Sequence, residues 1–190
     1  MTTRQVRTIS RKDSGPVLDV EAIPESTGQY LAGFANGEGS FNVSFRPRRD
    51  YPRKWKISLC FNVSQRDELI LRLFARHLGC GTMRQRPDGV WYLEVNNLRD
   101  INSNVLPFFR RFGFLSEKKQ RDLDKFRAIA ELMTQGAHLT PEGVRAILEI
   151  RRYMNDGGKR RYEEREILLG FPLGESSETV RRTRVTKDTR

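Results

Sequence analysis

Residues 30 to 41 of the chain read Tyr30-Leu31-Ala32-Gly33-Phe34-Ala35-Asn36-Gly37-Glu38-Gly39-Ser40-Phe41. Gly33 and Gly37 are four residues apart, so in a helix both lie on one face and leave it without side chains. A second helix could approach that face backbone to backbone. Glu38 falls in the last turn, where the helix dipole is negative and a carboxylate is favoured only if a cation lies beside it. The glycine spacing alone also fits a buried small-residue helix followed by a solvated Glu.

The whole segment resembles the motif of the LAGLIDADG homing endonuclease family. It matches the family consensus at Leu31, Ala32, Gly33, Gly37 and Gly39. Glu38 occupies the acidic, metal-binding position, and Asn36 replaces an Asp that is not the family's metal ligand. The resemblance covers residues 27 to 135 and includes the strings FNVSQ (61–65), GCGTMRQR (79–86) and LSEKKQ (115–120).

The resemblance implies a fold, an activity and three catalytic residues. Glu38, with Gly37 beside it, would bind Mg²⁺ or another divalent cation such as Mn²⁺. Gln65 would position the water network at the scissile phosphate. Lys119 would contact the phosphate or stabilise developing charge, and its neighbour Lys118 is the alternative for that role. Family members cut both strands of a long, roughly palindromic DNA site across the minor groove and leave short 3′ overhangs, and their genes usually lie within introns or inteins.

Charge gives an independent indication of the partner. The chain has 35 Lys and Arg against 24 Asp and Glu, a formal charge of +11, and a pI of about 10.2. Such an excess indicates a polyanion, most commonly nucleic acid, although basic structural proteins share it. No apolar run approaches the ~20 residues of a membrane-spanning helix, and no secretory signal is visible at the N-terminus. We therefore expect an intracellular protein, cytoplasmic or organellar, whose partner is neither a membrane nor a small-molecule substrate.

The chain has too few cysteines and histidines for several kinds of metal site and active site. Cys60 and Cys80 are the only cysteines, so one chain cannot assemble a Cys-type zinc site, and both thiols are expected to be free in a reducing cell. His77 and His138 are far apart in sequence, which disfavours nucleases that need two neighbouring histidines. Hydrolysis by this chain should depend on carboxylates and a bound divalent metal.

Four segments alternate with period two, which predicts strands that are apolar on one face and polar on the other. The first two are joined by a cationic connection, with six basic residues and one acidic residue from Arg46 to Lys56. A polar sheet face can be merely solvated. Here it is mostly basic, with Glu94 as its acid, and amides and hydroxyls suited to base edges lie between the charges. The residues we expect to contact DNA are Asn42, Ser44, Arg46, Arg48, Arg49, Arg53, Lys54, Lys56, Ser58, Asn62, Ser64, Thr82, Arg84, Arg86, Tyr92 and Glu94.

The element pattern is αββαββα, which predicts an α+β core with an antiparallel DNA-binding sheet and additional C-terminal helices. The first helix should begin near Ser26 or Thr27 and end between Gly37 and Gly39. A helix from Asp67 to Leu78 and helices after Asn97 complete the pattern. We expect an N-terminal extension over 1–26, an endonuclease domain over 27–156, and a basic, partly mobile extension over 157–190.

Only one copy of the motif is present. A single helix cannot bury its own glycine face, so two chains should pair through Tyr30, Gly33, Phe34 and Gly37. Pairing would bring two Glu38 carboxylates together, and these repel unless cations lie between them. The sequence thus predicts a homodimeric, Mg²⁺-dependent, site-specific double-strand DNA endonuclease. An RNA-splicing maturase or a non-catalytic DNA-binding protein on the same scaffold is the alternative.

Overall fold

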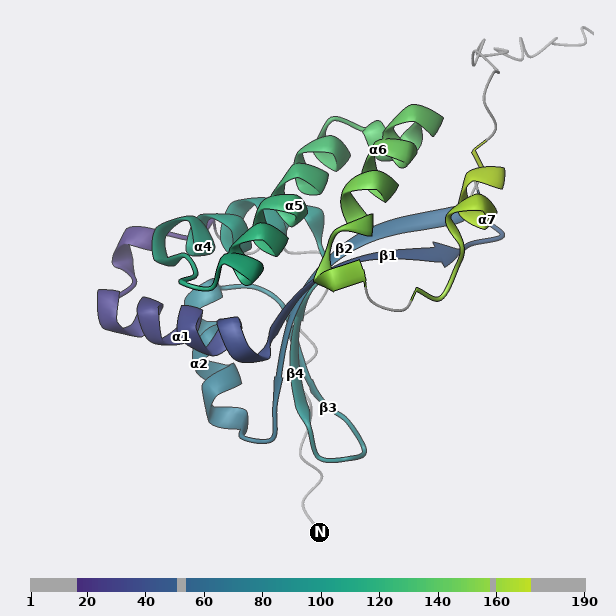
Figure 1. Ribbon diagram of the computed structural model, residues 1–190. Helices are drawn as coiled ribbons and strands as arrows, with labels where there is room; N and C mark the ends of the chain where they lie inside the picture. The colour runs from purple at the N-terminus through teal and green to yellow at the C-terminus, as the bar shows by residue number, and fades with distance from the viewer. Residues whose placement is uncertain (1–16, 51–53, 158–159, 172–190) are drawn as a thin grey trace, which may run out of the picture.

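A computed structural model describes residues 17–50, 54–157 and 160–171. Within these ranges the strands are β1 (Gly39–Pro47), β2 (Trp55–Gln65), β3 (Thr82–Gln85) and β4 (Trp91–Val95). The helices are α1 (Glu25–Glu38), α2 (Glu68–Leu78), α3 (Leu98–Asp100), α4 (Leu106–Phe112), α5 (Glu117–Thr134), α6 (Pro141–Arg152) and α7 (Glu164–Leu169). The order α1-β1-β2-α2-β3-β4 followed by helices confirms the predicted αββαββα core and the α+β class (Figure 1).

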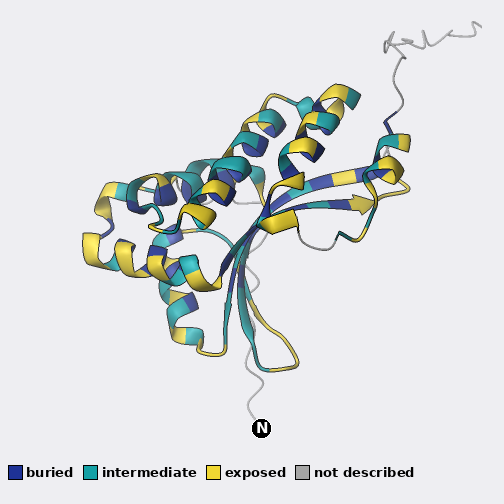
Figure 2. Cartoon of the chain, viewed as in Figure 1, coloured by how far each residue is buried: buried dark blue, intermediate teal, exposed yellow. Residues whose placement is uncertain are grey.

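The sheet is antiparallel, with strand order β1-β2-β4-β3, so β1 and β3 are its edges. Along β1 and β2 the odd-numbered residues are buried except Pro47 and Gln65, and most of the even-numbered ones are half-buried. The helices pack on the buried face: α1 contacts β1 and β2, α2 contacts β2, β3 and β4, and α5 contacts β1. Figure 2 shows the dark, buried sides of α4, α5 and α6 turned inward and their yellow sides turned outward.

Phenylalanine rings fill the space between the sheet and the helices. Phe41 of β1 lies 5.2 Å from Phe61 of β2 and 5.5 Å from Phe109 of α4, measured between ring centroids. Phe126 of α5 lies 5.1 Å from Phe41. These rings are buried, and aromatic pairs at such spacings contribute about 0.5–1.5 kcal/mol beyond the area that they bury. The cluster fixes β1, and with it the residues just before β1, against α4 and α5.

Local sequence signals account for most helix ends. Asp67 caps α2 by accepting a hydrogen bond from the Leu69 N–H at 2.8 Å. Gly79 ends the helix with φ +65°, a left-handed conformation that favours glycine. Thr140 caps α6 through the Gly143 N–H, and Pro141 opens that helix. The sequence predicted the first of these two helices over Asp67 to Leu78, one residue longer than α2.

The start of α1 differs from the prediction by one or two residues. The helix begins at Glu25, and Pro24 precedes it without a side-chain cap. Proline has a fixed φ close to the helical value, so it can lead directly into a helix. Gly28, in the next turn, packs against the ring of Phe112 so closely that an added Cβ would lie 2.2 Å from it. This close approach sets the depth of α1 on α4.

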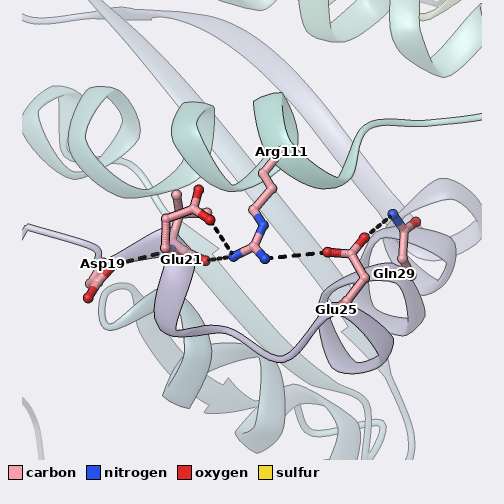
Figure 3. Close-up of polar contacts among 6 residues, drawn as sticks. Asp19, Glu21, Glu25, Gln29 and Arg111 are labelled. Atoms are coloured by element: carbon pink, nitrogen blue, oxygen red, sulfur yellow. Dashed lines mark hydrogen bonds and ion pairs between the residues drawn. The ribbon is translucent and has the colours of Figure 1, made fainter.

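Arg111 of α4 holds the segment that leads into α1 (Figure 3). Its guanidinium donates to the carbonyl of Val20 and lies 3.5 Å from a carboxylate oxygen of Glu21 and 3.4 Å from one of Glu25. Glu25 also accepts a hydrogen bond of 2.9 Å from the Gln29 amide. One partly buried arginine thus joins α4, the 3-10 turn Val20–Ala22 and the first turn of α1.

The chain after α6 returns to the sheet and packs against it. Asn155–Gly157 form a turn whose three residues have positive φ, and Ile167 and Phe171 are buried in the same core as the rest. The ring of Tyr162 lies 5.0 Å from that of Trp55, at the start of β2. The sequence did not predict α7, because a helix of six residues is too short to show a clear period. The domain boundaries at 26/27 and 156/157 stay predictions, and residues 1–16 and 172–190 lie outside the described residues.

A second difference concerns the helical segment after Asn97. A π turn, Ile101–Val105, separates α3 from α4. Pro107 in the first turn of α4 has no N–H to donate to a preceding carbonyl, which explains a local change of hydrogen-bond pattern here. The apolar positions Ile101 and Val105 remain fully buried in spite of it.

Candidate functional site

Glu38 is the last residue of α1, and its side chain is exposed. The next residue, Gly39, begins β1 and donates its N–H to the Ala35 carbonyl, which closes the helix. The carbonyls of the last helical turn otherwise have no partner within the helix, so they are available to an external group. Glu38 therefore presents its carboxylate at the helix C-terminus, beside backbone oxygens that include that of Gly37.

Lys119 reaches the same point from another element. It lies in the first turn of α5, where Ser116 caps the helix by accepting from its backbone N–H at 3.4 Å. Its ammonium donates a hydrogen bond of 2.6 Å to the Gly39 carbonyl. Burial lowers the pKa of this ammonium, Asp122 raises it, and Lys118 lowers it further. A partly desolvated cation thus lies one residue from Glu38.

Lys118, the alternative to Lys119, points elsewhere. Its ammonium forms an exposed ion pair with Asp156, and that hydrogen bond raises its pKa. The structure therefore places Lys119, rather than Lys118, next to the end of α1. The catalytic role of Lys119 stays a prediction.

Gln65 ends β2 at the same end of the sheet. Val63 pairs with Gly39, so Gln65 lies two residues beyond the start of β1. Its position in the alternation puts it on the side of the buried residues, not on the polar face. The side-chain oxygen accepts a hydrogen bond of 2.8 Å from the Arg66 N–H, and the amide nitrogen remains as a donor. Three elements therefore bring Glu38, Gln65 and Lys119 to one end of the β1–β2 pair.

A single chain offers few metal ligands at this point. Among the described residues, no three His, Cys, Asp or Glu side chains lie close enough to hold a metal ion. The groups present, a carboxylate and backbone carbonyls, are oxygen donors of the kind that Mg²⁺ and Mn²⁺ prefer. The donor type fits a divalent cation, and the number of donors from one chain is incomplete.

The polar face of the sheet is formed as the alternation predicts. Across β1 and β2, Asn42 pairs with Cys60, Ser44 with Ser58 and Arg46 with Lys56. Across β4, Asn62 and Thr82 both pair with Glu94, while Ser64 and Arg84 both pair with Tyr92. These side chains share one face because paired residues in a sheet point to the same side. Arg48 and Arg49 extend the face into the turn after β1, and Lys54 precedes β2. Arg53 lies outside the described residues.

Three arginines of this face are paired with acids. Arg48 pairs with Asp50, Arg84 with Glu94, and Arg86 with Asp88 at 2.8 Å. The Arg86 guanidinium also lies 4.9 Å from the ring centroid of Tyr92. The hydrogen bond from Arg48 holds the pKa of the Asp50 carboxyl at about 2. The alternation of the strands predicts Glu94 as the acid of this face but not Asp88, because Asp88 is in a turn and not in a strand.

Cys60 is a further member of the polar face that the expected set of contacts omitted. The alternation gave a signal, because Cys60 lies between Ser58 and Asn62 with even parity. Burial raises the pKa of its thiol to about 11, so it is neutral at physiological pH. Burial likewise raises the pKa of Cys80 to about 12, and both cysteines are free.

One face of α1 is open around its two glycines in the described part of the chain. A Cβ added at Gly33 or Gly37 would have no heavy atom within 4 Å. Tyr30 on the same face is 60% exposed, while Phe34 is partly buried against the core. The opposite side of the helix, with Leu31 and Ala35, is fully buried. The predicted pairing surface is therefore uncovered in a single chain, and its use by a second chain stays a prediction.

A search of the described helices finds none with the length and apolar content needed to cross a membrane.

Comparisons with known proteins agree on one family. A sequence model described as LAGLIDADG endonuclease matches residues 31–130. The probable intron-encoded endonuclease 2 of Neurospora crassa is 27% identical over 139 residues, and the match covers 71% of this chain and 30% of that protein. This chain thus spans less than a third of the length of that relative.

Solved structures match in fold as well as in sequence. The homing endonuclease I-TnaI is 30% identical with a TM-score of 0.64, and the match covers 75% of this chain and 94% of that one. The LAGLIDADG homing endonuclease I-SmaMI, solved bound to cleaved DNA, is 30% identical with a TM-score of 0.65. That match covers 70% of this chain and 45% of I-SmaMI.

Proposed function

The chain belongs to the LAGLIDADG endonuclease family, and from this premise we propose that it is a site-specific endonuclease that cuts both strands of double-stranded DNA as a homodimer. The observation that carries the proposal is the end of α1. There an exposed carboxylate, Glu38, follows a glycine face that none of the described residues covers, and the ammonium of Lys119 lies against the next residue. A protein that only binds DNA has no need of this combination.

Dimerisation completes the site. Glycine in a helix interior costs about 0.5–1 kcal/mol relative to alanine, so Gly33 and Gly37 are unfavourable unless a close contact uses them. The contact we propose is the same face of a second copy, because a two-fold interface brings one patch against itself. Glu38 of each chain then lies close to the axis. Two carboxylates and neighbouring carbonyl oxygens supply the donors that one chain lacks.

Mg²⁺, or another divalent cation such as Mn²⁺, would be held by Glu38 and the Gly37 carbonyl. When bound, such ions neutralise charge on a phosphodiester and activate water. The chain's own residues have separate roles. The Gln65 amide orients the attacking water through its N–H donors, and Lys119 stabilises the negative charge that develops on the phosphate oxygens. Glu38 anchors the cations and sets where the scissile phosphate lies.

The polar sheet face is the proposed DNA-binding surface. Its arginines and lysines contact phosphates and guanines, and its amides and hydroxyls contact other base edges. I-SmaMI, which shares the fold, was solved with DNA. Two copies of the face, one on each side of the axis, fit a long and roughly palindromic target. The gene is proposed to lie within an intron and the protein to act in the cytoplasm or an organelle. Within the chain, we propose that 27–156 forms the endonuclease domain, flanked by extensions.

The test uses the intronless allele of the gene's own locus as a DNA substrate. Wild type, Glu38→Gln and Glu117→Gln are incubated with it and Mg²⁺, and double-strand cuts are mapped by sequencing. Glu117 is an exposed acid on α5 whose carboxylate forms an ion pair with Arg121 at 3.5 Å, so it is the matched control. Wild type and Glu117→Gln should cut at one site, and Glu38→Gln should cut at least about 10³-fold more slowly while still binding the DNA.

Two results would count against the proposal. Equal cutting by wild type and Glu38→Gln would remove Glu38 from the chemistry. Binding of the locus by wild type without any cut would favour a DNA-binding or RNA-splicing role on the same scaffold.

A further inference from the structure

The edge strand β1 has its first carbonyls occupied from outside the sheet. Among the described strands β1 pairs with β2 alone, so its other edge would leave backbone groups free. Two side chains donate hydrogen bonds to carbonyls at this edge. Lys119 donates to the Gly39 carbonyl at 2.6 Å, and Asn155 donates through Nδ2 to the Phe41 carbonyl at 3.0 Å. The two contacts lie two residues apart, immediately after Glu38.

Asn155 is itself fixed to α5. Its backbone N–H donates a hydrogen bond of 3.0 Å to Oδ1 of Asp122. Asp122 is only 6% exposed and lies one helical turn after Lys119. Asn155 therefore bridges the start of β1 to the helix that carries Lys119.

The bridge uses an unusual backbone conformation. Asn155 has φ +50°, and the following Asp156 has φ +54°. Asparagine and aspartate are the non-glycine residues that adopt this region most readily, and such strain persists only where the surroundings determine it. The ion pair of Asp156 with Lys118 holds the next residue of the turn to α5 as well.

We propose that Asn155 is a positioning residue for DNA cleavage, which sets the separation of Glu38 and Lys119 by holding β1 against α5. It lies outside the region of the family match, residues 31–130. The inference rests on the proposed function, because it assigns Asn155 a task in that reaction. The Asn155 hydrogen bonds described above go to Asp122 and to the Phe41 carbonyl, neither of which is assigned to the reaction or to DNA, so Asn155 acts through the backbone of β1. A displacement of about 1 Å between reacting groups can cost roughly 100-fold in rate.

Two variants remove the bridge and keep the backbone. Asn155→Gly accepts φ +50° and retains the N–H that binds Asp122, so it loses only the bond to Phe41. Asn155→Asp has the same shape and also tolerates this φ, but it presents a carboxylate oxygen to the Phe41 carbonyl. The control is Asn102→Asp, since the Asn102 amide donates to the Thr134 hydroxyl at 2.9 Å, between the π turn and the end of α5.

The first measurement separates turnover from binding. In both Asn155 variants kcat should fall about 10- to 100-fold, while the Kd for target DNA, measured without divalent cations, should stay within about twofold of wild type. Asn102→Asp should change neither. A kcat equal to wild type in both variants would overturn the proposal, and so would a Kd that weakens by the same factor as kcat.

The second measurement needs no DNA. Amide hydrogen exchange of Gly39, whose N–H closes α1, should be about tenfold faster in the Asn155 variants, while exchange within α2 stays unchanged. Equal acceleration in both places would indicate global destabilisation and overturn the proposal. Because this readout is independent of cleavage, a wild type that cuts no DNA would contradict the proposed function while the role of Asn155 in holding β1 was still measured.

Discussion

The ammonium of Lys119 lies 2.6 Å from the carbonyl oxygen of Gly39, so the first turn of α5 is tied to the residue after Glu38. A lysine ammonium has three N–H donors, and the carbonyl takes one of them. The others can reach a phosphate oxygen without breaking this bond. The Glu38 carboxylate and the Lys119 ammonium, which have opposite charges, are therefore both at the junction of α1 and β1.

Replacement of Lys119 should reduce catalysis more than binding. We expect Lys119→Met to lower kcat roughly 100-fold, because it removes the charge that stabilises the transition state. The Kd for target DNA should change much less. Lys118→Met is the control, since Lys118 pairs with Asp156 instead. A larger loss of activity in Lys118→Met than in Lys119→Met would reverse the assignment.

The pH dependence of cleavage should reflect the same lysine. Burial lowers the pKa of Lys119 below the ordinary lysine value of 10.5. The required form is the ammonium, so kcat should fall as pH rises through this lowered pKa. Lys119→Arg stays charged over the whole range and, if active, should lose this alkaline decline. A decline that is the same in both proteins would assign it to another group.

Gly33→Leu should give a folded monomer. A Cβ at Gly33 has no heavy atom of the described residues within 4 Å, and leucine is a better helix former than glycine by roughly 1 kcal/mol. On the proposed two-fold interface it would collide with the partner. Sedimentation should show a monomer for the variant and a dimer for wild type, with unchanged circular dichroism. A contrasting variant is Gly28→Ala, whose Cβ would meet Phe112 at 2.2 Å and should destabilise the fold itself.

Glu94→Gln should strengthen binding to non-specific DNA. Glu94 accepts from Arg84 and, at 2.8 Å, from the Asn96 amide, so its loss frees an arginine on the polar face. One more unpaired cation should make the slope of log K against log salt more negative by about 1. This slope can be measured by fluorescence anisotropy over a series of salt concentrations. Glu68→Gln breaks an equivalent pair with Arg72 on α2, off the sheet, and should leave the slope unchanged.

Arg111→Met should destabilise the protein by about 1–3 kcal/mol. The guanidinium donates to the Val20 carbonyl, and that charged hydrogen bond carries most of the expected effect (Figure 3). The carboxylates of Glu21 and Glu25 are mostly exposed and contribute little. Urea denaturation compares it with Arg110→Met, whose side chain is exposed on the same helix. Equal losses in the two variants would show that the contacts of Arg111 contribute nothing specific.

The sequence predicted the parts of the fold that have strong local signals. The alternation of apolar and polar residues predicted the strands and the faces that they bury. In β1 and β2 every second residue is buried, except Pro47 and Gln65 at the strand ends. The predicted helix from Asp67 to Leu78 agrees with α2 to within one residue, since Asp67 caps that helix and Gly79 ends it. The resemblance to a family gave Glu38, Gln65 and Lys119, which the fold places at one end of the sheet.

What the sequence did not give depends on contacts between distant residues. Nothing near Asn155 indicates that its amide reaches Phe41, 114 residues away. The Arg111 contact to Val20 spans 91 residues and is likewise invisible to local patterns. The sequence alone also left open whether Lys118 or Lys119 lies beside Glu38, since neighbouring residues on a helix point in different directions.

Odd-numbered residues of β1 and β2 build the core, and even-numbered residues form the polar face. Within the same two strands, one set of residues therefore stabilises the fold and the alternate set forms the proposed DNA-binding surface. On the proposed DNA-binding surface, we expect substitutions at Asn42, Ser44 and Asn62 to change the DNA target without disturbing the phenylalanine cluster beneath them. We therefore expect that mutations can change which DNA sequence such a protein binds while its free energy of unfolding stays almost constant.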